Sequence, residues 1–196
     1  MQLIAHRKNT IAELSATSGQ LGIEVDVRIH NSKLVCQHDP LKPGDLFEEW
    51  LGHYSHKTLI VNVKEEGLEE LVLEALARHK IEDFFFLDQS FPFLLKHAKK
   101  GLSRAAVRVS EFESLETALN LKGLVSWVWV DLFGDFPLSN DNIQALKSAG
   151  FKLCLVSPEL HGRTDEKLVS DLKELFKALE FIPDAVCTKR ADLWGV

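Results

Sequence analysis

Three short polar segments near the N-terminus carry residue types that could do chemistry together. They are Ala5-His6-Arg7, Glu24-Val25-Asp26 and Gln37-His38-Asp39, and each lies at the end of an apolar stretch. Carboxylates can hold a divalent cation through their oxygens, and histidines can move protons near neutral pH. If these segments meet in one site, the first hypothesis is metal-assisted chemistry on a phosphoester.

The elements that must position these residues are apolar runs that alternate with helix-like stretches along the chain. Several runs are nearly continuous in β-branched or aromatic residues, which is typical of strands buried on both faces. The expected strands are 3–5, 23–27, 59–63, 84–87, 105–109, 126–130, 152–156 and 185–187, with a hairpin extension at 34–36. The expected helices are 46–54, 68–78, 93–99, 115–121, 142–148 and 165–179.

Eight strands alternating with helices predict an α/β fold, a small (β/α)8 TIM barrel. A barrel usually needs about 250 residues, and this chain has 196. We therefore expect lean connections and reduced first and last helices. An open doubly wound sheet is the alternative. The length suits one domain, residues 1–196.

Polar residues stand where a barrel would use them, because active-site residues project from the carboxyl ends of barrel strands. Glu24, Asp26 and Arg28 alternate along one strand, so they share a face. Further polar residues at expected strand ends are His6, Arg7, Asn62, Lys64, Asp88, Arg108, Asp131 and Ser157-Pro158-Glu159.

These residues resemble the glycerophosphodiester phosphodiesterase family, a TIM-barrel group related to phosphatidylinositol-specific phospholipase C. The family pattern is matched by His6-Arg7 followed by Asn9-Thr10, by Glu24-Val25-Asp26, by His38-Asp39 and by Ser90-Phe91. The resemblance covers most of the chain; it is specific over residues 3–39 and weaker beyond residue 91. It implies a phosphoric diester hydrolase that acts on a glycerophosphodiester or a similar small phosphodiester.

The resemblance also implies a cation site made by Glu24, Asp26 and Asn62. The family's third strand ends in Glu-x-Lys, whereas this chain reads Asn62-Val63-Lys64. An amide oxygen can still ligate a hard cation, but it brings no charge, so the affinity for Mg²⁺ or Ca²⁺ should fall. Asp88 or Asp131 could compensate from neighbouring strands.

The other implied roles are acid–base catalysis and phosphate binding. His6 and His38 would form the acid–base pair, while Arg7 and Lys64 would neutralise phosphoryl charge. The segment 156–163 resembles a compact bacterial subgroup. His161 and Arg163 follow a strand end in a glycine-containing loop of this segment, where they could contact a phosphate or headgroup. A surface salt bridge in that loop is the alternative for this last pair.

Two other functions stay open at this point. A barrel that has lost metal chemistry through Asn62 could bind a phosphorylated headgroup without hydrolysis. An aldolase or isomerase could use Lys64 as a Schiff-base lysine, although nearby carboxylates disfavour the low pKa that such a lysine needs. Glu24 and Asp26 could also form plain ion pairs with Arg28 or Lys64.

Composition limits the kinds of binding partner and the cellular compartment that we expect for this chain. A net charge of -6 argues against a nucleic-acid partner, which needs a basic surface. The apolar windows are too short for export or membrane insertion. Three widely spaced cysteines, Cys36, Cys154 and Cys187, predict a reduced, cytoplasmic setting. The short segment 40–44 after His38 leaves the site open or covered by a second copy of the chain, a homo-oligomer. Four other histidines are interpreted as surface residues: His53, His56, His79 and His97.

Overall fold

The structure is a computed structural model that describes residues 1–195, and it divides into two compact units. Unit 1 is Met1–Ile4 together with the chain from Gly101 onward, and unit 2 is Ala5–Lys100. Strands and helices alternate in both units, which confirms the predicted α/β class. Closure of the strands into one eight-stranded barrel and the single domain 1–196 stay predictions.

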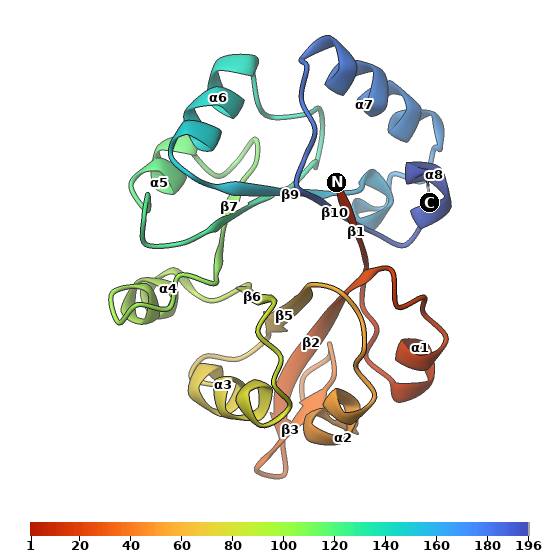
Figure 1. Cartoon of the computed structure of the whole chain (residues 1–196), viewed down its shortest axis with the longest axis vertical. Coiled ribbons are helices and arrows are strands. Elements are labelled where there is room, and N and C mark those ends of the chain that lie inside the picture. The colour runs from red at the N-terminus through yellow and green to blue at the C-terminus, as the bar shows by residue number, and fades with distance from the viewer. Residues whose placement is uncertain (196) are drawn as a thin grey trace. The chain divides into compact units, whose positions relative to one another are not determined.

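Unit 2 is built on a sheet with the strand order β4-β3-β2-β5-β6, coloured orange to green in Figure 1. Strand β2 pairs in parallel with β5, and β5 pairs in parallel with β6. Strands β3 and β4 continue the sheet as antiparallel neighbours of β2. The elements are α1 (Ile11–Ser15), β2 (Gly22–His30), β3 (Lys33–Cys36), β4 (Asp45–Leu46), α2 (Phe47–Gly52), β5 (Leu59–Val63), α3 (Glu69–Arg78), β6 (Phe84–Leu87) and α4 (Phe91–Ala98).

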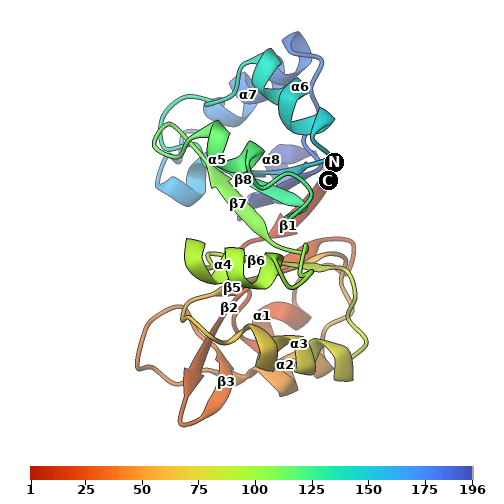
Figure 2. The same ribbon diagram turned by 90° about the vertical axis from the view of Figure 1, so that its left-hand side faces the viewer.

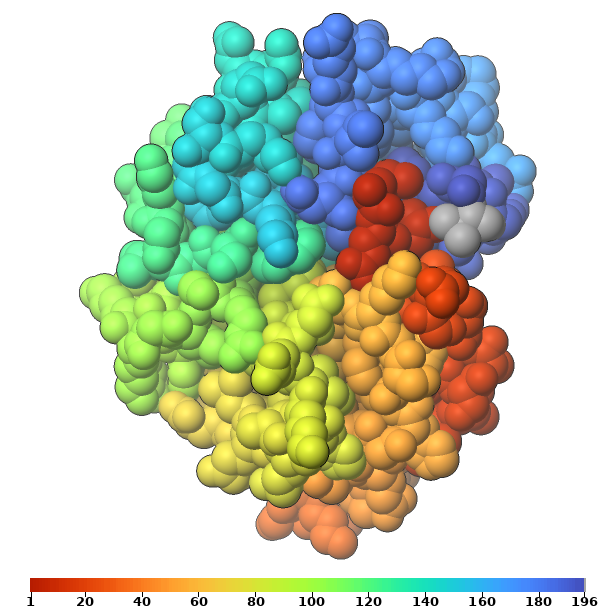
Figure 3. Space-filling model, viewed as in Figure 1, coloured from red at the N-terminus to blue at the C-terminus, as the bar shows by residue number. Residues whose placement is uncertain are grey.

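Helices α2 and α3 lie side by side in unit 2. Arg78 of α3 pairs with Glu48 of α2 at 2.8 Å, and the orange and yellow segments adjoin in the space-filling view (Figure 3). Helix α3 forms because Val72, Ala75 and Leu76 recur at helical spacing, and all three are buried. The two helices thus cover apolar surface next to the strands that carry the polar residues.

Unit 1 contains the strand order β1-β10-β9-β8-β7, in which β7 to β10 pair in parallel. Helix α5 is a neighbour of α6, and α7 is a neighbour of α8 (Figures 1 and 2). The elements are β1 (Gln2–Ala5), whose last residue belongs to unit 2, β7 (Ala106–Val109), α5 (Leu115–Leu119), β8 (Trp127–Val130), α6 (Asn140–Ser148), β9 (Lys152–Val156), η1 (Pro158–His161), α7 (Lys167–Ala178), β10 (Ala185–Thr188) and α8 (Ala191–Trp194).

The strand predictions agree closely with the structure, and β5, β6 and β9 have the predicted bounds. Helix α1 has five residues and α8 has four, so the terminal helices are reduced as expected. The positions of the short helices α1, η1 and α8 were not predicted, because four or five residues are too few to show a helical period. His97 of α4 is 4% exposed, so its interpretation as a surface residue was wrong. None of the helices within residues 1–195 has the length and apolarity needed to span a bilayer.

The loop that follows β1 is fastened to α2 and β4. The indole Nε1 of Trp50 donates to the carbonyl oxygen of Lys8 at 2.9 Å, and Ile11 N donates to Asp45 Oδ2 at 2.6 Å. Thr10 caps α1 in a reciprocal capping box with Glu13. These bonds fix both ends of the segment that follows His6 and Arg7.

We expect Trp50→Phe to lower the free energy of unfolding by about 1–3 kcal/mol, because the Lys8 carbonyl loses its donor beneath a fully buried ring. Chemical denaturation measures the change. The control is Glu49→Gln, an exposed position on the same helix, which should stay within about 0.5 kcal/mol. Equal stability of Trp50→Phe and the wild type would show that this bond does not hold the loop.

Candidate active site

Two carboxylates on β2 form the centre of the site. Glu24 and Asp26 point to the same face of the strand, and their exposed fractions are 1% and 0%. The parallel register sets Asp26 beside Asn62 of β5. Two buried like charges are unfavourable without compensation, so their surroundings decide what the site can do.

Glu24 is held by neutral donors. Its Oε2 accepts from the backbone N–H of Arg7 at 2.7 Å, and its Oε1 accepts from Asn62 Nδ2 at 2.9 Å. His6 Nε2 lies 3.8 Å from Oε2. Burial and, to a smaller extent, the charge of Asp26 raise the pKa of Glu24 to about 7. This carboxyl is therefore the member of the pair that an added positive charge would stabilise most.

Asp26 is surrounded by cationic and amide groups. Arg7 Nε lies 3.2 Å from its Oδ2, and Lys64 Nζ lies 3.4 Å from its Oδ1. Asn9 makes two hydrogen bonds with Asp26. Its Nδ2 donates to Asp26 Oδ2 at 2.8 Å, and its Oδ1 accepts from the Asp26 N–H at 2.9 Å. Lys64 also pairs with Asp88 at 2.9 Å. The expected ion pair of Lys64 thus forms with Asp26 and Asp88.

The backbone of Arg7 adopts a left-handed conformation, with φ of 51°. Residues other than glycine, asparagine and aspartate rarely adopt this region, and strain of this kind is concentrated at functional sites. The conformation lets one residue serve both carboxylates: its N–H reaches Glu24 and its guanidinium reaches Asp26.

Arg28 joins the ends of three strands. Its Nε donates to the carbonyl oxygen of His38 at 2.8 Å, and its Nη1 donates to the carbonyl oxygen of Lys64 at 3.0 Å. Nη1 also pairs with Glu65 at 3.2 Å. Arg28 is therefore a positioning residue that ties His38 and Lys64 to β2, rather than the ion-pair partner of Glu24 or Asp26.

His38 is oriented by its neighbour in the sequence. Its Nδ1 lies 2.9 Å from Asp39 Oδ1, and Lys42 Nζ bonds Asp39 Oδ2 at 2.7 Å. The hydrogen bonds from Lys42 and then from His38 lower the pKa of Asp39 to about 2. Asp39 is consequently ionised near neutral pH and can only accept, so the proton on His38 sits on Nδ1. The ring's Nε2 is the atom left for proton transfer.

The oxygen donors of the cluster fit a hard divalent cation. Asn62 Oδ1 is buried and accepts no hydrogen bond, which costs free energy. Asp26 Oδ1 accepts no hydrogen bond either, although Lys64 Nζ lies 3.4 Å from it. Within residues 1–195 no set of three or more His, Cys, Asp or Glu is arranged as a metal site. Two carboxylates, one amide oxygen and water make the donor set that remains, which suits Mg²⁺ or Ca²⁺ with reduced ligand charge.

A second polar cluster lies in unit 1, at the carboxyl ends of β7 and β8. Asp131 is 1% exposed; Arg108 bonds its Oδ2, Trp129 Nε1 donates to its Oδ1 at 3.2 Å, and His161 Nε2 lies 3.1 Å from Oδ1. Burial raises the pKa of Asp131, although Arg108 and His161 oppose the shift. The ring of Phe133 lies against His161, with centroids 4.4 Å apart. His161 is thus held by a carboxylate and an aromatic ring.

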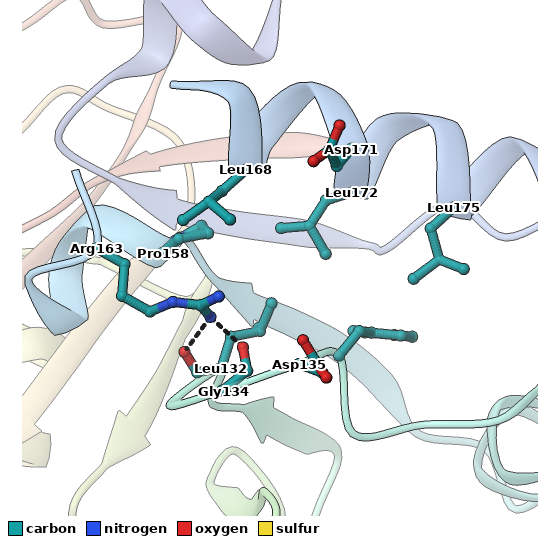
Figure 4. A pocket seen from close by; sticks show the side chains of 10 residues that line it. Leu132, Gly134, Asp135, Pro158, Arg163, Leu168, Asp171, Leu172 and Leu175 are labelled. Carbon is teal, nitrogen blue, oxygen red and sulfur yellow. Dashed lines mark hydrogen bonds between the residues drawn. The ribbon is translucent and has the colours of Figure 1, made fainter. Parts of the chain in front are cut away.

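The guanidinium of Arg163 donates hydrogen bonds to backbone carbonyl oxygens of the segment that follows β8. Figure 4 shows its guanidinium directed at the carbonyl oxygens of Leu132 and Gly134. It lines a cavity of about 290 Å³ together with Leu168 and Leu172 of α7. Its role in phosphate binding, like that of His161, stays a prediction.

The structure therefore gathers most of the predicted site in unit 2. Four predicted residues contact the carboxylates of Glu24 or Asp26. They are His6, Arg7, Asn62 and Lys64. Sequence reasoning missed the roles of Asn9 and Arg28. The sequence did contain signals for these two roles. Asn9 closely follows His6-Arg7, and Arg28 lies on the same strand face as Glu24.

Comparisons with known proteins support the fold. No family model matches the chain, and no curated protein matches its sequence. The crystal structure of glycerophosphodiester phosphodiesterase from Agrobacterium tumefaciens is similar with a TM-score of 0.73 at 14% identity, over 100% of both chains. A glycerophosphoryl diester phosphodiesterase from Parabacteroides distasonis is similar with a TM-score of 0.66 at 12% identity, over 96% of this chain and 82% of that one. The chain therefore shares its fold with two phosphodiesterases of the kind that its strand-end motifs resemble.

Proposed function

We propose that the protein is a metal-dependent hydrolase of a glycerophosphodiester or a similar small phosphodiester. The observation that carries the proposal is the buried pair Glu24 and Asp26, with His6, Arg7 and Lys64 against it. Cleavage of a phosphodiester requires acidic, basic and proton-transferring groups in one cluster. The shared fold supports the same reading.

Glu24, Asp26 and Asn62 would hold the cation, Mg²⁺ or Ca²⁺. When bound, such an ion supplies positive charge that polarises the phosphoryl oxygens and favours the attacking oxygen as a nucleophile. Arg7 and Lys64 would bind the phosphate oxygens and neutralise the charge that develops on them. Both side chains stand within 3.4 Å of Asp26, which supports a shared role for them at one site.

His6 and His38 would divide the proton transfers. One takes the proton from the attacking hydroxyl or water, and the other gives a proton to the alcohol that leaves phosphorus. If the attacker is a hydroxyl of the substrate itself, a cyclic phosphate forms first and water opens it in a second step. Asp39 keeps His38 in the tautomer that presents Nε2.

The remaining parts of the proposal concern unit 1 and the setting. We propose that the strands close into a small (β/α)8 barrel and that His161 and Arg163 contribute to substrate binding. Cys36, Cys154 and Cys187 are buried and form no disulfide within the described residues, which suits the cytoplasmic setting we propose. The partner is a small phosphodiester rather than a nucleic acid, and assembly into a homo-oligomer remains open.

A catalytically weakened, headgroup-binding protein is the second candidate, and one observation favours it. Arg7 and Lys64 already flank Asp26, and Asn62 donates to Glu24, so the carboxylates are partly compensated without a cation. Binding of a divalent ion separates the two candidates.

We expect Mg²⁺ or Ca²⁺ to raise the melting temperature of the wild type and to bind in calorimetry. Glu24→Gln should abolish this binding, and Asn62→Asp should tighten it by roughly tenfold, or about 1.4 kcal/mol, because it adds a ligand charge. Without the ion, Asn62→Asp should melt lower than the wild type, since an oxygen replaces the Nδ2 donor facing Glu24.

The matched control is Asn140→Asp, which makes the same change of charge at an exposed position of α6. It should not alter the affinity for the ion, and it should not lower the melting temperature, because a negative charge in the first turn of a helix is favourable. Absence of divalent-ion binding by the wild type would reject the metal-dependent mechanism in favour of the headgroup-binding alternative.

We expect His6→Ala and His38→Ala each to lower kcat by roughly 10²–10⁴-fold, the usual contribution of acid–base catalysis. Substrate affinity should change much less, because Arg7 and Lys64 still hold the phosphate. A double variant should lose little more than the worse single variant, because the two act in one proton-transfer cycle. Single-turnover hydrolysis of a glycerophosphodiester measures the rate, with binding followed separately. His53→Ala, at an exposed position, is the control, and wild-type turnover in His6→Ala would remove that residue from the mechanism.

A further inference from the structure

The loop between β3 and β4, residues 37–44, carries His38 and is closed tightly at its base. Cys36 and Asp45 pair there in antiparallel register. A Cβ atom on Gly44 would collide with the carbonyl oxygen of Cys36, so glycine is needed where the two arms of the loop pass each other. Both ends of the loop are therefore fixed by the sheet.

The side chain of Gln37 spans this loop. Its Oε1 accepts from the Asp39 N–H at 3.0 Å, and its Nε2 donates to the carbonyl oxygen of Pro43 at 2.8 Å. The Gln37 N–H in turn donates to the carbonyl oxygen of Asp26 at 3.0 Å, so the residue is anchored on β2 beside the carboxylate pair. A side-chain amide accepts at one atom and donates at the other, and these two backbone groups of opposite polarity require both.

The contact between Asp39 and His38 is too exposed to orient the ring alone. Their side chains are 47% and 42% exposed, and Lys42, which pairs with the other oxygen of Asp39, is 62% exposed. Exposed pairs of this kind contribute little, because holding two mobile side chains in one geometry costs entropy. Gln37 reduces that cost by fixing the backbone of Asp39. Arg28 fixes the backbone of His38 through its carbonyl oxygen.

The tip of the loop has a conformation that its residue does not favour. Leu41 has a left-handed φ of 61°, which is uncommon for a bulky residue. Its side chain is 93% exposed, so packing does not hold it there. The bond from Lys42 to Asp39 spans this residue. The longer bond from Gln37 to Pro43 spans it as well. Strained backbone persists only where the surrounding structure over-determines it, so these bonds constrain the loop.

We propose that Gln37 is a positioning residue for the acid–base reaction. It fixes Asp39 and, through Asp39, the direction and the tautomer of the His38 ring. Gln37 has no role in binding the cation or the phosphate, and it acts only through the ring that moves the proton. This inference rests on the proposed phosphodiesterase function and deepens it.

The test uses Gln37→Met, which keeps the length of the side chain and removes both hydrogen bonds. We expect kcat to fall by roughly 10–100-fold, since a misplaced catalytic group costs less than a missing one. KM should stay within about twofold of the wild type, because the phosphate contacts of Arg7 and Lys64 are unchanged. Gln37→Glu keeps an acceptor for the Asp39 N–H and loses the donor, so its kcat should lie between those of Gln37→Met and the wild type.

A double-mutant cycle distinguishes positioning from general stability. In a His38→Ala background, Gln37→Met should change kcat by less than about twofold, because the ring through which it acts is gone. The matched control is Gln20→Met, at an exposed position of the same unit, which should keep the wild-type kcat. Wild-type kcat in folded Gln37→Met, or the same fractional loss with and without the His38 ring, would overturn the proposal. If Gln37→Met does not fold, Gln37→Glu takes its place in the cycle.

Nitrogen-15 NMR of the His38 ring separates this inference from the proposed function, because it needs no turnover. In the wild type the neutral ring should carry its proton on Nδ1, facing Asp39. Gln37→Met should show a mixture of the two tautomers, and this result would support the positioning role even if no diester were hydrolysed, an outcome that would count against the hydrolase alone. A fixed Nδ1–H tautomer in Gln37→Met would overturn the positioning role, and hydrolysis that still depends on His38 would leave the hydrolase standing.

Discussion

The burial of two carboxylates on one strand is the constraint on which the rest of unit 2 depends. An uncompensated charge in a protein interior costs several kcal/mol, and Glu24 and Asp26 are both fully enclosed. The charge of Asp26 is compensated by Arg7, Asn9 and Lys64. The left-handed turn at Arg7 follows from this need, since it brings a peptide N–H to Glu24 at the same time as a guanidinium to Asp26.

Rigidity around the pair comes from bonds to the backbone. Arg28 donates to the carbonyl oxygens of His38 and Lys64, and Trp50 donates to that of Lys8. Because these hydrogen bonds go to backbone carbonyl oxygens, they hold His38, Lys64 and Lys8 in place without occupying the polar groups of those side chains. The consequence is an arrangement whose positions are set by the sheet, as accurate catalysis requires.

The strands with a regular pattern of apolar and polar residues could be predicted from the sequence. Strands such as β5 and β6 are uninterrupted apolar runs, and the alternation of Glu24 and Asp26 places both on one face whatever surrounds them. The shared face, rather than any single residue, is what made the carboxylate pair predictable. Closure of the barrel depends on pairing between distant segments, which no local pattern encodes.

Contacts made through loops could not be predicted in the same way. Asn9 reaches Asp26 across a turn whose conformation depends on Arg7. The burial of His97 depends on the packing of α4 near Glu69, whereas its sequence neighbours are lysines and suggest a surface. In each case the direction in which the side chain points depends on the packing of several helices, strands and loops together.

The groups that compensate Glu24 and Asp26 come from one contiguous stretch of chain, from Arg7 to Lys64. Among the residues that the structure describes, Asp88 extends this network beyond the stretch through its ion pair with Lys64. The loss of any one of these groups would leave a buried carboxylate with less compensation. The network therefore acts as one electrostatic unit that lies wholly within unit 2.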